Sequence, residues 1–169
     1  MSPQVPQDAR QRETSPPAPL SRLADTARKF FETTDPPMLV RRVCEESCDL
    51  LGADRALIAR VDFGEVIRQE IIQVHQVPPE FLDLAERSTL VSQMLPDLFR
   101  EGRPHVIQGL VFDPNSVLGD AGNQTVCIVP LIVDREPYGW LGLVHLSSKE
   151  YSHEDLMLAE SLGDLASLA

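Results

Sequence analysis

Polar and reactive side chains interrupt stretches of this chain that are otherwise apolar. Arg60 stands within the run LIARV, Cys127 within TVCIVPLIV, and Trp140 and His145 within YGWLGLVHL. An unpaired charge among apolar residues is costly, so Arg60 needs an anionic partner or a route to water. It could bind a ligand carboxylate or phosphate with two guanidinium nitrogens, or it could pair with an acidic side chain and extend to solvent.

The cysteine, the histidine and the tryptophan each allow a chemical and a structural interpretation. Cys127 could contact a ligand or act as a nucleophile, but thiol exchange needs a second thiol within reach. The other cysteines, Cys44 and Cys48, lie on a separate, distant segment. His145 could contact a ligand or a haem, or could be a hydrogen-bonded residue of a packed strand. Trp140 could form the wall of a pocket or fill the core.

A further group of polar residues lies between positions 109 and 124, where turn-forming residues are dense. Asp113, Asn115, Asn123 and Gln124 could recognise a polar ligand. As turn formers they have an equally good local role, because such side chains bond to nearby backbone groups. Loops of this length inside a compact domain are usually functional or mobile, which makes the segment a candidate ligand-binding region.

The cysteine spacing gives little support to a metal site. Cys44 and Cys48 are one helical turn apart and could supply half of such a site. No second ligand pair accompanies them, and both fall on the apolar side of a predicted helix, where a thiol packs as a small hydrophobe. We therefore expect no metal.

The composition indicates one globular domain. The chain has 169 residues, of which 43% are hydrophobic and 24% charged, and this suits a single domain with a substantial core. A net charge of −11 argues against binding to nucleic acid or to an anionic membrane surface. No apolar run reaches the roughly 18 residues of a membrane span, and no apolar signal core begins the chain. A cytoplasmic protein is expected.

The elements that must position these residues follow from caps, turn residues and apolar spacing. Residues 1–19 are rich in proline and contain hardly any large apolar side chains, which predicts a disordered tail. One helix is expected over 20–34. A second is expected from Asp35, as its N-cap, to Gly52, as the residue that ends it.

Strands are expected where β-branched and aromatic residues gather between turn residues, at 55–62, 65–76, 104–108, 125–133 and 138–146. The last two are joined by Asp134–Pro137 and are apolar at nearly every position, which predicts central strands covered on both faces. Short helices are expected at 80–87 and 89–100, with Pro96 kinking or splitting the second. A final helix begins at Ser152, with Asp155 as its capping partner.

This order of elements predicts an α+β sandwich around a central antiparallel sheet of five to six strands. From about Phe30 to Ala169 the chain resembles the GAF domain family. The resemblance rests on the turn at 134–137, the pair Pro130-Leu131, the run from Gly139 to Leu143, and Gly102-Arg103-Pro104 before a short strand. It implies one GAF-like domain over 20–169, with a bundle of N- and C-terminal helices on one face of the sheet. Short helices and the long loop would cover a possible pocket on the other face.

GAF domains typically hold a small molecule between the sheet and these covering segments. Here the resemblance points to the strand faces at 55–61 and 127–145, roofed by 78–123. Arg60, Cys127, Trp140 and His145 lie on those strands. Bilin-binding relatives often carry a Cys-His pair at the chromophore, and no such pair is recognisable, so the sequence does not support a bilin. Its isolated histidines do not support haem either.

Most GAF domains are sensors, and the resemblance therefore implies a non-catalytic domain that senses a small molecule. We expect the N-terminal input module of a larger signalling protein, such as a sensor histidine kinase or a cyclic-dinucleotide enzyme. Its first and last helices would form a homodimer, and an output domain would follow Ala169. One alternative is a dimerisation platform without a ligand. Another is a GAF-type reductase of free methionine sulfoxide, although the long loop lacks the cysteines that such an enzyme uses.

Overall fold

The computed structural model describes residues 19–79, 81–82, 88–109 and 124–169. Within them, five strands form one antiparallel sheet in the order β2-β1-β5-β4-β3, which confirms the predicted α+β class. The elements are α1 (Pro19–Phe31), α2 (Pro36–Leu51), β1 (Arg55–Phe63), β2 (Ile67–His75), α4 (Thr89–Glu101), β3 (His105–Gln108), β4 (Thr125–Val133), β5 (Glu136–His145) and α5 (His153–Leu168). Apart from Pro19, the predicted tail lies outside the described residues, as does most of the predicted helix at 80–87.

Side-chain caps fix two helices where the sequence predicted them. A carboxylate oxygen of Asp35 accepts a hydrogen bond from the backbone N–H of Met38, and Gly52 ends α2 with a φ of +67°. At the start of α5, Ser152 and Asp155 each accept a hydrogen bond from the other's backbone N–H. These caps satisfy backbone groups that a helix end leaves without partners.

Two local features differ from the expectation. Asp134 and Arg135, with φ of 53° and 68°, make a two-residue turn between β4 and β5, so β5 begins at Glu136 rather than at Tyr138. Pro96 does not split its helix, because α4 runs without a break from Thr89 to Glu101. Pro96 lies on the exposed side of α4, where a carbonyl group that loses its helical partner can bond to water.

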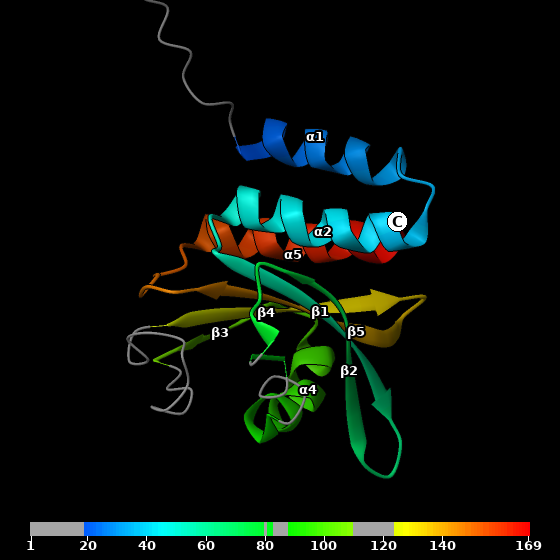
Figure 1. Ribbon diagram of the computed structural model, residues 1–169, viewed down its shortest axis with the longest axis vertical. Coiled ribbons are helices and arrows are strands. Elements are labelled where there is room, and N and C mark those ends of the chain that lie inside the picture. The colour runs from blue at the N-terminus through cyan, green and yellow to red at the C-terminus, as the bar shows by residue number, and fades with distance from the viewer. Residues whose placement is uncertain (1–18, 80, 83–87, 110–123) are drawn as a thin grey trace, which may run out of the picture.

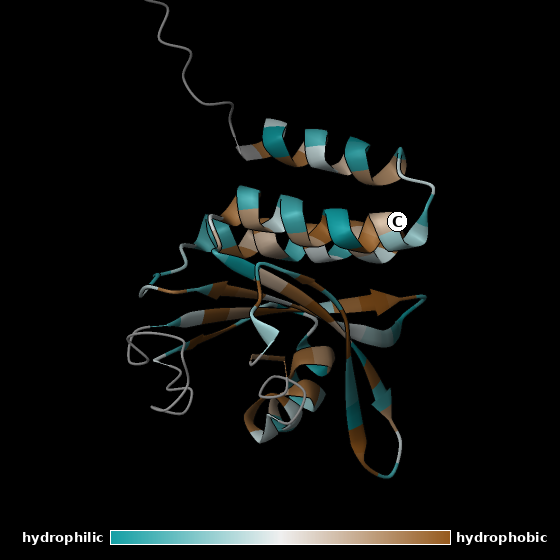
Figure 2. Cartoon of the chain, viewed as in Figure 1, coloured by the Kyte–Doolittle hydropathy of each residue, from teal (hydrophilic) through white to brown (hydrophobic). Residues whose placement is uncertain are grey.

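The molecule is layered, as Figure 1 shows. Helices α2 and α5 lie against one face of the sheet, α1 packs on them from outside, and α4 lies against the opposite face. In Figure 2 the helices alternate hydrophilic and hydrophobic stretches, as amphipathic helices do. Among the helices that the structure describes, none is long and apolar enough to cross a membrane.

Both faces of the sheet are buried, and each has its own core. On the face toward α2 and α5, the core includes Cys44, Cys48 and Cys127, together with Leu141 and Leu143. On the face toward α4, it includes buried side chains from the centre of β1, β4 and β5 and from α4, among them Leu57, Leu95, Leu98, Ile128 and Trp140. The predicted burial of the central strands on both faces is thus confirmed.

Helix α5 packs closely on β4, and Gly163 makes this possible. A Cβ atom on Gly163 would lie 2.6 Å from Cγ1 of Val129 and 3.1 Å from the carbonyl oxygen of Pro130. Glycine in the middle of a helix lowers helix stability by roughly 0.5–1 kcal/mol relative to alanine. At this position its lack of a side chain lets the helix pack directly on the strand.

Candidate functional site

A small apolar cavity of about 30 Å³ lies between the sheet and α4. Residues that are direct partners on neighbouring strands share a face, and along one strand the faces alternate. The cavity floor therefore comes from one set of alternate residues, namely Leu57, Val126, Ile128, Trp140, Gly142 and Val144 together with Ile107 at the sheet edge. Phe81, Ser88 and Val91 complete the lining.

A chain of hydrogen bonds connects the sheet with α4 beside this cavity. The indole N–H of Trp140 donates to Oε1 of Gln69 at 2.9 Å, and Nε2 of Gln69 donates to Oγ of Ser92 at 2.9 Å. Ser92 in turn donates to the backbone carbonyl of Ser88, the N-cap of α4. These hydrogen bonds connect β5, β2 and the first turn of α4, and they hold α4 in its position on the sheet.

Sequence reasoning did not identify Gln69, Ser88 or Ser92. The available signal was the row Ile67, Gln69 and Ile71 on β2, because one polar side chain between two apolar ones on a strand face needs a partner there. The serines are ordinary helix-start residues by sequence, and only the fold brings them beside Gln69.

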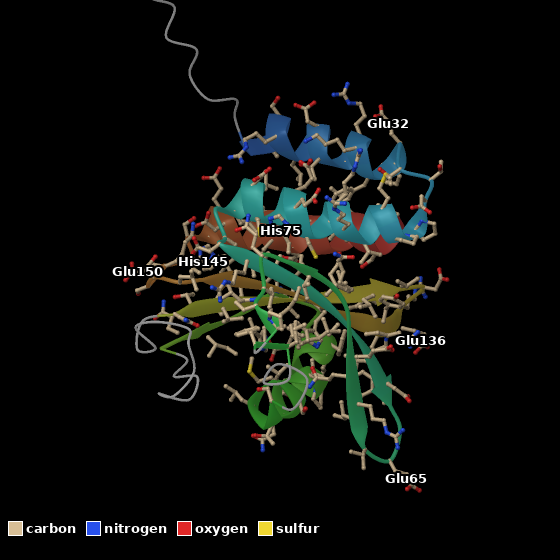
Figure 3. The ribbon with its side chains drawn as sticks, in the orientation of Figure 1. Glu32, Glu65, His75, Glu136, His145 and Glu150 are labelled. Carbon is tan, nitrogen blue, oxygen red and sulfur yellow. The ribbon has the colours of Figure 1, made fainter. Side chains whose placement is uncertain are left out.

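A second polar cluster lies on the opposite face, under α2 and α5. Nε2 of His145 is 2.7 Å from the hydroxyl oxygen of Tyr151, and that hydroxyl lies beside the thiol of Cys127. The imidazole of His145 also lies beside the backbone of Gly52 at the end of α2. Figure 3 shows His145 at the end of the sheet remote from Glu136. This cluster ties the end of α2 to β4, β5 and the segment before α5.

Burial makes the groups of this cluster unreactive. Burial raises the pKa of the Cys127 thiol to about 12 and that of Cys48 to about 12, so both thiols stay protonated at neutral pH. Burial also raises the pKa of the Tyr151 hydroxyl. A thiol acts as a nucleophile or a metal ligand in its ionised form. Within the described part of the chain, no group of three or more histidine, cysteine, aspartate or glutamate side chains could hold a metal ion.

Protonation of His145 should destabilise the fold. Burial, and next the charge of Lys149, lowers the pKa of His145 below the ordinary value of 6.5, so below that pH the unfolded chain binds a proton that the folded chain does not. The contribution of neutral His145 to the free energy of unfolding is complete above about pH 6.5. It decreases as the pH falls, by at most about 1.4 kcal/mol per pH unit. We expect His145→Asn to lose less stability than the wild type between about pH 7 and pH 5 in urea unfolding.

His153 provides the matched control, because it lies exposed at the start of α5. His153→Asn should follow the pH dependence of the wild type. If His145→Asn also follows it, the buried histidine does not contribute to the acid sensitivity of the fold.

The comparisons with known proteins agree with this architecture. A family model described as GAF domain matches residues 33–169. The chain belongs to the GAF domain family. No curated protein matches the chain, so its relatives are described by fold alone.

Several solved GAF structures are similar to this one. The GAF domain of a phosphoenolpyruvate-protein phosphotransferase from Coxiella burnetii matches 88% of this chain and 90% of its own, with a TM-score of 0.64 and 16% identity. The GAF domain of a protein assigned as a sensor histidine kinase from Pseudomonas syringae pv. tomato matches 89% of this chain and 83% of its own, with a TM-score of 0.60 and 17% identity. Identities this low show a shared fold.

The match to a larger protein covers only part of it. The photosensory core module of the Stigmatella aurantiaca phytochrome matches 89% of this chain at a TM-score of 0.68 and 18% identity, but this chain spans 35% of that module. The GAF domain described here therefore corresponds to one portion of a longer light-sensing assembly in that relative.

The structure brings only part of the predicted site of this GAF domain to the cavity. Trp140 lines it. Gln124 is buried immediately before β4, two residues from the lining residue Val126. Asp113, Asn115 and Asn123 lie outside the described residues, so their predicted role stays a prediction.

Three predicted residues point to the other face of the sheet, which corrects their assignment to the pocket. Cys127 packs in the core under α2 and α5, and His145 bonds to Tyr151 on that side. Arg60 lies on the same face of β1 as Ile58, which belongs to the core under α2 and α5. Its side chain is exposed and forms an ion pair with Glu70 of β2. The physical reason is the two-residue period of a strand: each of these residues is one position away from a cavity-facing neighbour.

The two helix cysteines also need a correction. Cys44 and Cys48 were expected to be distant from Cys127, yet all three belong to one core cluster because α2 lies against the strand face that Cys127 occupies. All three are buried, free thiols.

Proposed function

We propose that this GAF domain senses a small molecule and has no catalytic activity of its own. The observation that carries the proposal is the cavity enclosed between the sheet and α4. Among the described residues that line it, the polar groups are the hydroxyl of Ser88 and the indole N–H of Trp140, and none of these residues is ionisable. Such a surface suits the apolar part of a ligand, and these residues offer no ionisable acid or base to a substrate.

Ligand binding must enlarge the cavity. A volume of about 30 Å³ holds about one water molecule, whereas small-molecule pockets commonly measure roughly 300–1,000 Å³. The wall that would move is α4, because only Leu95 and Leu98 of this helix are completely buried. Its other apolar contacts with this core are made by partly buried side chains. A ligand would therefore select and stabilise a conformation in which α4 lies farther from the sheet.

Strand β4 offers a route from this cavity to α5. Val126 and Ile128 line the cavity on one side of β4, and Val129 meets Gly163 of α5 on the other. A ligand that displaces β4 would thus change the packing of α5. In this proposal α5 passes the signal to an output domain after Ala169 of a cytoplasmic signalling protein, such as a sensor histidine kinase or a cyclic-dinucleotide enzyme. The resemblance to GAF domains named for a sensor kinase and a phosphotransferase supports this context.

A screen of metabolites by thermal unfolding tests the proposal. At a concentration of about 100 times its Kd, a ligand of the native state should raise the Tm by roughly 5–10 °C. Val91→Phe places a ring in the cavity and should weaken binding at least tenfold. Leu90→Phe makes the same change on the neighbouring residue, which is 42% exposed, and should bind as the wild type does.

Two outcomes would count against sensing in this cavity. One is a broad screen with no saturable stabilisation. The other is a ligand whose Kd is unchanged in Val91→Phe while that variant still unfolds cooperatively. Either result would favour the dimerisation platform, which rests on a groove of about 390 Å³ between α1 and α5. Leu20 and Leu168 at that groove are 78% and 74% exposed, and a second copy of these helices would cover them.

The methionine sulfoxide reductase is the weaker alternative. Its thiol mechanism needs an ionised, accessible cysteine. Cys127 is fully buried on the face away from the cavity, and its pKa is raised to about 12 by burial. Sulfoxide turnover that is lost in Cys127→Ser and retained in Cys44→Ser would establish this alternative.

A further inference from the structure

One row of paired residues crosses the cavity face of the sheet and begins with an arginine. Arg55 on β1 is the direct partner of Val144 on β5, Val144 pairs with Val126 on β4, and Val126 pairs with Ile107 on β3. Directly paired residues share a face. Since Val144, Val126 and Ile107 all line the cavity, Arg55 stands on the cavity face, at the end of this row.

The guanidinium group of Arg55 has a buried nitrogen without a partner. Nη1 is buried and meets no hydrogen-bond acceptor among the described residues. By contrast, Arg60, five residues along the same strand, is exposed and paired with Glu70. The acid closest in sequence, Asp54, accepts a hydrogen bond from the backbone N–H of Leu146 at 2.8 Å. A buried charged donor without an acceptor is costly, so such a group beside a cavity requires an explanation, and an anionic ligand would provide one.

We infer that the ligand of this domain is an apolar molecule that carries a carboxylate or phosphate, and that Arg55 binds this anionic group. The inference rests on the proposed function, because it concerns the same cavity. The apolar body would lie over Leu57, Val126 and Trp140, and the anion would reach the end of the row, where the guanidinium can offer two parallel N–H donors.

Matched probes test the charge requirement. Phenylacetate and phenylacetamide have nearly the same shape but differ in charge, and phenyl phosphate distinguishes a phosphate from a carboxylate preference. We expect the preferred anion to bind the wild type about tenfold to 100-fold more tightly than the neutral amide, as a charged hydrogen bond would give. Arg55→Gln should abolish that difference and Arg55→Lys should keep part of it. Arg60→Gln, on the opposite face, should leave it unchanged.

The outcomes separate this inference from the proposed function. If the amide binds as tightly as the anions, or if Arg55→Gln keeps the preference, the cavity binds ligands but Arg55 is not an anion site. If neither the anions nor the amide bind, and the wider screen gives no ligand, the proposed function fails and the inference fails with it.

A measurement without ligand provides an independent test. Because Arg55→Met removes a charged side chain of which one nitrogen is buried without a partner, it should raise the Tm of the unliganded domain by about 2–4 °C. Arg60→Met removes an exposed ion pair and should leave the Tm nearly unchanged. A clear fall in the Tm of Arg55→Met would mean that the guanidinium stabilises the fold, and it would overturn the inference.

Discussion

Replacing Gly139 with alanine is expected to destabilise this domain by about 4 kcal/mol or more, which is exceptional for a single substitution. Gly139 lies on β5 directly opposite Arg60 of β1. A Cβ atom there would overlap the carbonyl oxygen of Ala59 and lie 3.1 Å from Cα of Arg60. Both are backbone atoms of the neighbouring strand, so relief requires the strands to separate and their hydrogen bonds to lengthen. The free energy of unfolding in urea measures the effect.

Gly64 is the control for this substitution. It lies in the turn between β1 and β2, and the nearest atom to an added Cβ is the carbonyl oxygen of Val66 at 3.8 Å. Gly64→Ala should therefore stay within about 0.5 kcal/mol of the wild type. A Gly139→Ala variant whose unfolding free energy also lies within 1 kcal/mol of the wild type would show that the sheet accommodates a methyl group at this point.

The second large effect is expected for Gly163→Leu in α5. The added side chain would meet Cγ1 of Val129 and the carbonyl oxygen of Pro130, and the helix would have to move away from β4. Overpacking of this kind commonly costs about 1–3 kcal/mol, which exceeds the roughly 0.8–1 kcal/mol that a better helix former contributes. We expect a net loss of about 1 kcal/mol, and at most about 2 kcal/mol, in the free energy of unfolding.

Glu160→Leu serves as the comparison, because Glu160 lies on the exposed side of the same helix. It should be neutral or slightly stabilising in the same urea titration. If Gly163→Leu is as stable as Glu160→Leu, the close approach of α5 to β4 does not constrain the packing of this helix.

The sequence predicted the elements well because local chemistry determines them. Asp35 and Gly52 bound α2, and Ser152 with Asp155 begins α5, since each cap depends on residues within one helical turn. The strands predicted at 125–133 and 138–146 were recognisable by composition, and the structure has them at Thr125–Val133 and Glu136–His145. The sequence could not decide whether Pro96 splits its helix, because the tolerance of a helix for proline depends on which side of α4 meets water, and this is a tertiary property.

The candidate site was predicted less well because β1, β4 and β5 are apolar on both faces. In a strand with one solvent-exposed face, polar and apolar residues alternate and show which side chains point inward. These three strands lack that alternation. Arg60 and Arg55 lie on the same strand, yet they stand on opposite faces and only Arg55 belongs to the cavity face. Cys127 and Ile128 are adjacent in sequence and are likewise separated by the sheet. The position of α4 decides which face holds the cavity.

The place of Trp140 gives the domain its own optical reporter. It is the single tryptophan of the chain, it lines the cavity, and its indole N–H bonds to Gln69 beside α4. Intrinsic fluorescence excited through this one side chain would therefore follow the opening of the cavity in unlabelled protein. Rapid mixing with a ligand would then show whether the cavity opens before or after the ligand binds. The rate of the fluorescence change depends differently on ligand concentration in the two cases.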